Sequence, residues 1–179
     1  MKFDIVKDFL NSKKILCISG KSCSGKTKLA IDIVKALNIS TVYIDTNNEI
    51  NSINNGKLTL WKISNFNEIL KHIEQLKGYY SSKKCIVVID CLSTINFNSN
   101  FLSNNLKKFI NILNKIQNES SIRFIVTTQL YMDLNNNYLN LPNLDNSTVN
   151  TFFISSYKDL DNLKLKQQLL KVKLKNILE

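Results

Sequence analysis

Eight consecutive residues near the start of the chain combine glycine, lysine and hydroxyl side chains at a spacing that suits phosphate binding. They match the pattern G-x-x-x-x-G-K-[ST] and are Gly20, Lys21, Ser22, Cys23, Ser24, Gly25, Lys26 and Thr27. In such a loop, backbone N–H groups approach an anion, the lysine reaches the outer phosphates and the hydroxyl binds Mg²⁺. We therefore expect ATP and Mg²⁺ to bind here. Lys26 is a candidate catalytic residue, and Lys28 completes the expected nucleotide-binding set.

A second pattern supplies a carboxylate for the metal ion. Residues 85–89 are consecutive apolar β-formers, and Asp90 follows them directly. Such a run is typical of a central strand buried on both faces. In open α/β sheets, ligands bind at the carboxyl ends of such strands. We therefore expect Asp90, together with Thr27, to hold Mg²⁺ directly or through water.

Apolar periodicity predicts the elements that must position these residues. The predicted strands are 14–19, 41–45, 58–61, 84–90, 122–129 and 151–155, and the predicted helices are 25–37, 66–76 and 102–116. Alternating strands and helices favour an α/β fold with a mainly parallel sheet, right-handed crossovers and helices on both faces.

The two ends of the chain and one internal segment are less regular. We predict a short helix within 1–12, a long Asn-rich loop over 132–148, and antiparallel strands towards the C-terminus. The alternation of residues 160–179 favours a β-hairpin, although Lys, Leu and Gln are also good helix formers.

Length and composition limit the class of protein. The 179 residues are 44% hydrophobic and 21% charged, which is typical of one globular domain spanning 1–179. We recognise no signal peptide and no membrane-spanning stretch, so we expect an intracellular protein, cytoplasmic or nucleoid-associated, without a membrane partner. The four cysteines lack metal-binding spacing. Cys23 and Cys91 are either lining residues of the nucleotide site or ordinary reduced thiols.

The net charge of +10 favours a polyanionic partner such as nucleic acid. The positive charge has two alternative explanations. AT-rich codons enrich a chain in Lys, Asn and Ile, and some of the lysines are needed to bind the nucleotide phosphates.

Four motifs occur in an order that resembles the ATPase core of RecA-type recombinases, above all the archaeal RadA and RadB proteins. They are 20–30, 42–46, 87–93 and 126–131, and the likeness extends over about residues 13–175. The resemblance implies a P-loop NTPase with a RecA-like core. The C-terminal antiparallel strand pair is predicted from the alternation of residues 160–179. It also implies single-stranded DNA as a partner, with a recombinase or self-association as a second.

The resemblance also implies roles for individual residues. Gln129 matches the glutamine that senses the γ-phosphate, and the segments 92–103 and 132–148 match the two DNA-binding loops. Asn47 stands where the family has the glutamate that activates water, and an amide cannot accept the proton. Glu49, two residues later, is the candidate replacement and the third expected catalytic residue.

The leading hypothesis is an ATP-binding accessory or mediator of homologous recombination and repair, with slow DNA-dependent ATPase activity. One alternative is a small nucleotide or metabolite kinase, although such enzymes use several arginines and this chain has only Arg123. The other alternative is a non-hydrolysing module whose assembly depends on the nucleotide.

Overall fold

The computed structural model describes residues 9, 12–53, 56–80, 83–95, 102–129, 131–132, 138–139 and 149–154 of the chain. Within these ranges, six strands form one sheet in the order β3-β2-β4-β5-β1-β8, and every neighbouring pair is parallel. The strands are β1 Ile15–Gly20, β2 Thr41–Asp45, β3 Leu58–Lys62, β4 Cys85–Asp90, β5 Ile122–Gln129 and β8 Val149–Ile154. The helices are α2 Lys26–Leu37, α3 Phe66–Tyr79 and α4 Leu102–Glu119.

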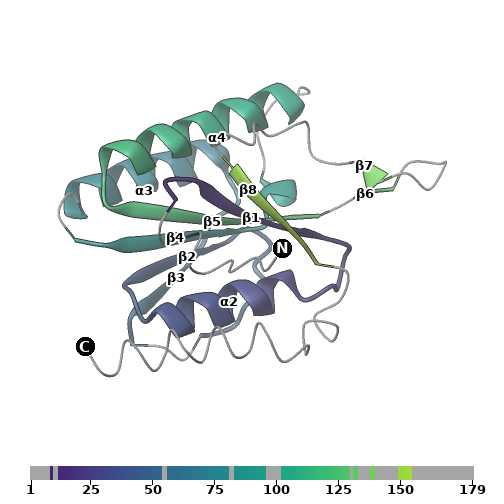
Figure 1. Cartoon of the computed structure of the whole chain (residues 1–179), viewed down its shortest axis with the longest axis horizontal. Coiled ribbons are helices and arrows are strands. Elements are labelled where there is room, and N and C mark those ends of the chain that lie inside the picture. The colour runs from purple at the N-terminus through teal and green to yellow at the C-terminus, as the bar shows by residue number, and fades with distance from the viewer. Residues whose placement is uncertain are drawn as a thin grey trace.

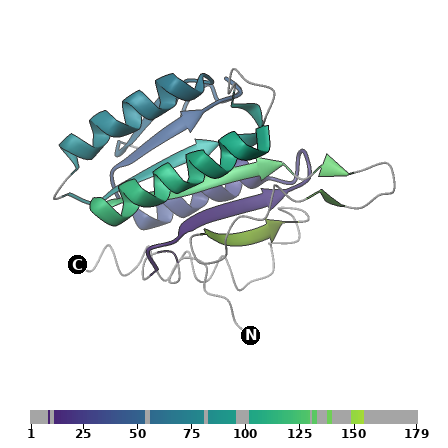
Figure 2. The ribbon, with the colours of Figure 1, turned by 90° about the horizontal axis from the view of Figure 1, so that it is seen from above.

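The sheet lies between two helical layers. Helices α3 and α4 cover one face and α2 covers the other (Figure 1), and the view from above shows α3 and α4 side by side (Figure 2). Strand β4 shows why the sequence produces this sandwich. Its odd-numbered residues join the core beneath α3 and α4, whereas Ile86 and Val88 join the core beneath α2. A continuous apolar run is therefore needed to bury both faces of the strand.

Local residues begin and end the helices close to the predicted bounds. Asn65 caps α3, because its side-chain oxygen accepts hydrogen bonds from the N–H groups of Asn67 (3.0 Å) and Glu68 (3.2 Å). Helix α2 follows Gly25 directly and ends before Asn38, which adopts the left-handed conformation common at helix C-termini. Within the described ranges, no helix combines the length and apolar character needed to cross a membrane.

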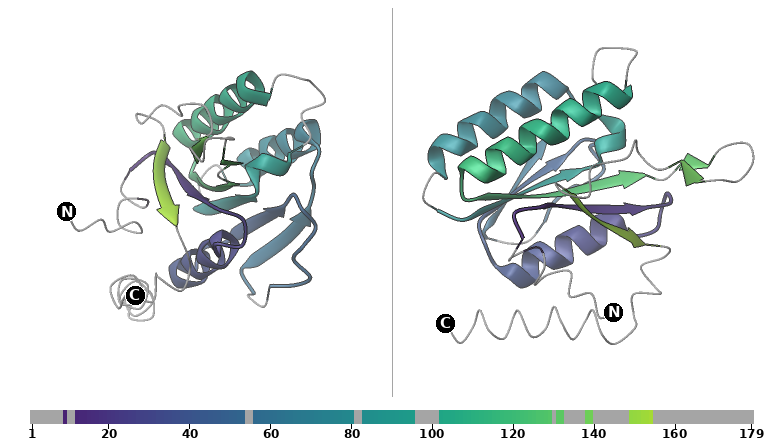
Figure 3. Two further views of the ribbon diagram at one scale, coloured as in Figure 1. Left: turned by 90° about the vertical axis from the view of Figure 1, so that its right-hand side faces the viewer. Right: turned by 45° about the horizontal axis from the view of Figure 1, so that its top comes forward.

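Strand β8 corrects one expectation. We expected antiparallel strands after β5, yet β8 runs parallel to β1, with Ile15 opposite Val149 and Gly20 opposite Ile154 (Figure 3). A parallel pairing needs a connection of a dozen or more residues, and the segment 130–148 is long enough to return the chain to the start of the sheet. Residue patterns identify a strand but do not set its direction.

Other expectations concern the segment after β5 and the two ends of the chain. Two short strands, β6 Tyr131–Met132 and β7 Tyr138–Leu139, form an antiparallel pair where we expected a loop. The predicted hairpin within 160–179 lies outside the described residues. So does the predicted helix within 1–12, except that Phe9 is helical and buried in the core beneath α2.

Candidate functional site

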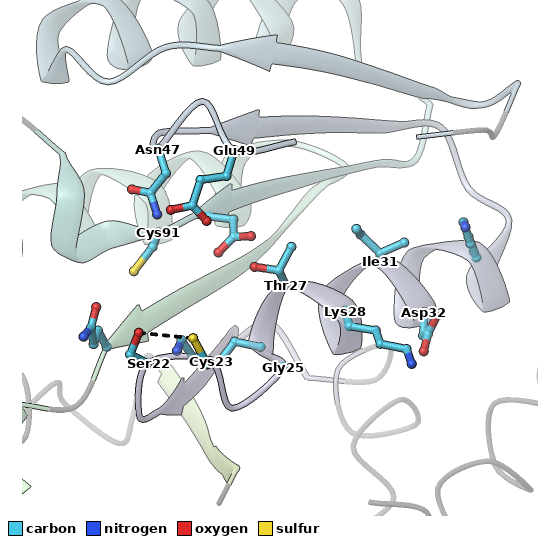
Figure 4. Close-up of a pocket in the computed structure, with 14 residues that line it drawn as sticks. Ser22, Cys23, Gly25, Thr27, Lys28, Ile31, Asp32, Asn47, Glu49 and Cys91 are labelled. Carbon is cyan, nitrogen blue, oxygen red and sulfur yellow. Dashed lines mark hydrogen bonds between the residues drawn. The ribbon is translucent and has the colours of Figure 1, made fainter. Parts of the chain in front are cut away.

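A cavity of about 630 Å³ opens at the carboxyl edge of the sheet, between the start of α2 and the ends of β2, β4 and β5 (Figure 4). Stretches that are distant in sequence therefore contribute to one site. The lining residues are Ser22, Cys23, Gly25, Lys26, Thr27, Lys28, Ile31, Asp32, Lys35, Asn47, Glu49, Asp90, Cys91 and Gln129.

The loop between β1 and α2 wraps one side of the cavity. Gly25 has φ 89° and Cys23 has φ 56°, so the chain turns sharply before the helix begins. The Lys26 ammonium points back across the loop and donates to the carbonyl of Lys21 at 2.6 Å. The backbone N–H of Ser24 donates to the same carbonyl at 3.3 Å. This arrangement places a cation and the N-terminal end of α2 at one spot, which suits a phosphate.

Three residues of the expected nucleotide-binding set do not line the cavity with the others. Gly20 ends β1, Lys21 contributes its carbonyl, and Ser24 is buried behind the loop. The hydroxyl of Ser24 has no hydrogen-bond partner among the described residues.

The carboxylate of Asp90 is held by two neighbouring strands. Tyr43 of β2 donates its hydroxyl hydrogen to Oδ2 at 2.7 Å, and Thr127 of β5 donates to Oδ1. Burial, followed by the charge of Asp90, raises the pKa of Tyr43, so the phenol stays a donor. Asp90 is only 7% exposed and lines the cavity. Sequence reasoning found Asp90 but missed both donors, because they lie on other strands.

A tight bend after β2 forms the opposite wall. The carboxylate of Asp45 accepts hydrogen bonds from the backbone N–H groups of Asn47 (3.1 Å) and Ile50 (2.7 Å), and Asn48 has φ 58°. The bend brings both Asn47 and Glu49 to the cavity, on the side occupied by Cys91 (Figure 4).

Gln129 ends β5 beside Gly20 of β1 and lines the cavity. Its backbone N–H donates to the hydroxyl of Ser93 at 3.0 Å, which connects the end of β5 to the turn after β4. That turn is a short 3-10 helix, Leu92–Thr94, whereas much of the expected DNA-binding segment 92–103 lies outside the described residues.

The one arginine of the chain lies at the other end of the sheet. Arg123 is the second residue of β5, and its guanidinium donates to the carbonyls of Ile122 (3.3 Å) and Gln117 (3.5 Å). Because Gln129 marks the cavity end of the same strand, Arg123 does not reach the cavity of its own chain.

The donor set fits a magnesium–nucleotide complex. Mg²⁺ prefers oxygen ligands, and the cavity offers the hydroxyl of Thr27 and the carboxylate of Asp90. Lys26 and Lys28 line the same cavity, and their positive charge suits phosphate oxygens. No group of three or more His, Cys, Asp or Glu side chains that could hold a metal by itself occurs within the described ranges.

Comparisons with known proteins agree with this geometry. A sequence model of the family nSTAND3, described as Novel STAND NTPase 3, matches residues 1–176. A search of curated proteins found no match. The crystal structure of the RadB recombinase aligns with 75% of this chain and 72% of its own, with 22% identity and a TM-score of 0.56.

A DnaB-like replicative helicase, solved in a study of its interactions with primase, aligns with 75% of this chain at 15% identity and a TM-score of 0.54. The alignment covers 43% of the helicase chain. At these identities, both likenesses establish a RecA-like fold and leave the roles of recombinase or helicase open. The match over nearly the whole length identifies the chain as a member of the nSTAND3 family of NTPases, built on a RecA-like P-loop core.

Proposed function

We propose that this protein binds ATP with Mg²⁺, hydrolyses it slowly, and acts as a DNA-binding accessory of recombination and repair. The observation that carries the nucleotide part is the cavity shared by Lys26, Thr27, Asp90, Glu49 and Gln129. These residues come from four segments of the chain, and each has a chemical role in phosphoryl transfer.

Each residue has a defined task in this proposal. Lys26 and the N-terminal end of α2 stabilise phosphate charge. Thr27 and Asp90 would hold a Mg²⁺ ion, which when bound would supply positive charge for the outer phosphates. Glu49 accepts the proton of the attacking water. Gln129 contacts the γ-phosphate, and the hydrogen bond from its backbone N–H to the Ser93 hydroxyl links this contact to the turn after β4.

Slow turnover follows from two features of the site. Asn47 has an amide at the position where RecA-type recombinases, which this sequence resembles, have a carboxylate. Glu49 must therefore serve as the general base. An arginine finger is worth roughly 10³–10⁵ in rate, and Arg123 lies at the opposite end of β5. The same position of Arg123 counts against a kinase, which needs cationic side chains around the transferred phosphoryl group.

The DNA part rests on charge and on distant structural likeness. The net charge of +10 favours a polyanion. The two similar structures are named as a recombinase and a replicative helicase. A second candidate is a non-hydrolysing module whose assembly depends on the nucleotide. It is favoured by the position of Arg123, because the one arginine of the chain lies away from the cavity lining and cannot assist hydrolysis there.

A binding experiment tests the nucleotide part. Fluorescent ATP with Mg²⁺ should bind the wild type and lose at least tenfold in affinity in Lys26→Ala. The matched control is Lys84→Ala, an exposed lysine just before β4 and outside the cavity lining, which should bind like the wild type. Equal affinity of Lys26→Ala and Lys84→Ala would refute the site.

A turnover experiment tests the assigned base. Since general-base catalysis contributes about 10²–10⁴ in rate, Glu49→Gln should abolish most of the slow hydrolysis while ATP still binds. Asn47→Glu should raise turnover at least tenfold. Unchanged turnover in Glu49→Gln would remove Glu49 from the mechanism.

A labelled oligonucleotide separates the DNA proposal from the assembly module. Single-stranded DNA should bind more tightly with ATP than without it, and the affinity should fall steeply as salt rises. If DNA does not bind at low salt while ATP increases the mass of the particle in solution, the assembly module is the better description.

A further inference from the structure

Thr46 follows β2 directly and is buried, with only 4% of its surface exposed. It stands opposite Cys91, because the register of the two strands pairs Asp45 with Asp90. Its backbone N–H donates to the carbonyl of Asp90 at 2.8 Å. Its hydroxyl accepts from the N–H of Cys91 at 2.7 Å and lies 2.8 Å from the carbonyl of Cys91. One residue therefore binds three consecutive backbone groups at the end of β4.

A second hydroxyl completes this cluster. Thr94, the last residue of the turn after β4, has its hydroxyl oxygen 2.6 Å from that of Thr46 and 2.9 Å from the carbonyl of Cys91. These three oxygens share two hydroxyl hydrogens, so each hydrogen has an acceptor. A buried polar cluster in which every donor is satisfied holds its members in fixed positions.

The cluster joins the two segments that carry the carboxylates of the site. Asp90 comes directly before Cys91, and Glu49 lies on the bend that the Asp45 carboxylate holds. Glu49 and Cys91 both line the cavity, with Glu49 on the side occupied by Cys91 (Figure 4). Glu49 itself is exposed, so its position depends on how the bend is attached. The Thr46 hydroxyl attaches the start of the bend to the residue after Asp90.

We propose that Thr46 is a positioning residue for hydrolysis. Its hydroxyl fixes the bend against the end of β4 and so keeps Glu49 in place relative to Asp90. Thr46 does not line the cavity, so it acts through Glu49 and does not touch the nucleotide. Without the hydroxyl, the N–H of Cys91 would lose its acceptor in a buried place, which costs free energy and favours movement of the bend. The inference rests on the proposed function, since it requires Glu49 to be the base.

The first test uses the protein without nucleotide. In Thr46→Val, NMR should show the backbone N–H groups of Cys91 and Ile50 exchanging with solvent about tenfold faster or more, because the cluster is opened. Thr46→Ser keeps the hydroxyl and should exchange like the wild type. Thr41→Val is the matched control: Thr41 is buried at the start of the same strand, and its hydroxyl donates to the carbonyl of Ile39 at 2.9 Å. Wild-type exchange at Cys91 in Thr46→Val would overturn the proposal.

The second test separates binding from chemistry by single-turnover hydrolysis with the protein in excess over ATP. Thr46→Val should lower the rate at saturation about tenfold or more, because the base is misplaced. Its affinity for Mg²⁺–ATP should stay at the wild-type value, since the phosphate loop does not contain Thr46. Thr46→Ser and Thr41→Val should hydrolyse like the wild type. Equal rates in Thr46→Val and Thr41→Val, or in Thr46→Val and Thr46→Ser, would overturn the proposal.

A double-mutant cycle asks whether Thr46 acts through Glu49. In a Glu49→Gln background, Thr46→Val should slow hydrolysis no further, because the base is already absent. Losses that multiply would show that Thr46 acts elsewhere and would overturn the proposal.

Thr94→Val keeps the test decisive if Thr46→Val does not fold. It removes one partner of the Thr46 hydroxyl and leaves the acceptor of the Cys91 N–H in place. Hydrolysis should slow about threefold, with ATP affinity unchanged. A wild-type rate in Thr94→Val would then overturn the proposal.

The two proposals fail in different ways. If the wild type does not bind ATP, or if Glu49→Gln hydrolyses ATP like the wild type, the proposed function fails and this inference fails with it. If Glu49→Gln slows hydrolysis and Thr46→Val does not, only the role of Thr46 is refuted.

Discussion

Two hydrogen bonds orient the carboxylate of Asp90, the residue expected to hold the metal ion. They come from Tyr43 and Thr127, on the strands to either side. Each donor occupies one carboxylate oxygen, so the group is held in one orientation, and its remaining lone pairs are available to a hydrated metal ion. We therefore expect Mg²⁺ binding to depend on residues outside the cavity lining.

Removing the Tyr43 hydroxyl should weaken both the fold and the metal site. A hydrogen bond to a charged group contributes about 1.5–3 kcal/mol, so Tyr43→Phe should lower the free energy of unfolding by about that amount. It should also raise the Mg²⁺ concentration needed for ATP binding. Urea denaturation and a Mg²⁺ titration measure the two effects.

Tyr79→Phe is the matched control for this substitution, because Tyr79 is 80% exposed at the end of α3. Its effect on unfolding should stay within about 0.5 kcal/mol. If Tyr43→Phe behaves like Tyr79→Phe in both measurements, the hydroxyl does not position Asp90.

The four thiols should differ in reactivity. Burial raises the pKa of Cys17 and of Cys85 to about 12, so both stay protonated at neutral pH, and Cys91 is also buried. Cys23 is exposed in the phosphate loop. A maleimide reagent should label Cys23 alone in the native protein, and ATP with Mg²⁺ should slow the reaction. Labelling of Cys23 at the same rate with and without the nucleotide would show that the loop is not covered.

Elements position the site through a few backbone conformations. The loop before α2 turns at Gly25, and the bend after β2 is held by the Asp45 carboxylate. These two segments face each other across the cavity. The loop before α2 depends on the conformational freedom of glycine. The bend after β2 depends on the hydrogen bonds that the Asp45 carboxylate accepts from backbone N–H groups.

Adding a methyl group at Gly25 should be costly. Its φ of 89° lies in the left-handed region, where an L side chain costs about 1–2 kcal/mol. Gly25→Ala should therefore lower the free energy of unfolding by that amount and weaken ATP binding at least tenfold. Thermal denaturation and calorimetry measure these changes.

Gly78→Ala provides the opposite control. Gly78 lies in α3, and a Cβ there meets no atom within 4 Å. Alanine favours helix over glycine by up to about 1 kcal/mol, so this variant should be slightly more stable and bind ATP normally. Equal stability of the two variants would contradict the role assigned to the turn.

At the scale of the whole molecule, the nucleotide should act as a stabilising ligand. It would connect the first helix of the sandwich, α2, to the ends of β2, β4 and β5, all of which must be folded for it to bind. At a concentration one hundred times its dissociation constant, a ligand adds about 2.7 kcal/mol to the free energy of unfolding. For a chain of this size, that corresponds to a rise in Tm of roughly 5–10 °C.

Lys26→Ala should show no such rise in Tm with ATP and Mg²⁺, whereas Lys84→Ala should show the full rise. Differential scanning calorimetry of the three proteins, at equal protein concentration, makes the comparison. A wild-type Tm that does not change with saturating ATP would contradict a nucleotide site formed by several elements.

Several features of this protein follow from its sequence alone. The phosphate loop, the buried strand that ends at Asp90 and the helix that begins near Lys26 were all predicted at their observed places. These features are local, because a glycine-rich turn and a run of apolar residues need only their own neighbours to be recognised. The RecA-like fold was predicted from the same motifs, and the similar structures support it.

Only the tertiary structure decided how distant residues meet. The parallel direction of β8 depends on the connection after β5, which returns the chain to the end of the sheet where β1 begins. The donors to Asp90 depend on strand order, since Tyr43 and Thr127 belong to flanking strands. The approach of Glu49 to the cavity depends on hydrogen bonds to Asp45. Strand order, register and such bends arise from contacts between segments far apart in the chain, which residue spacing does not reveal.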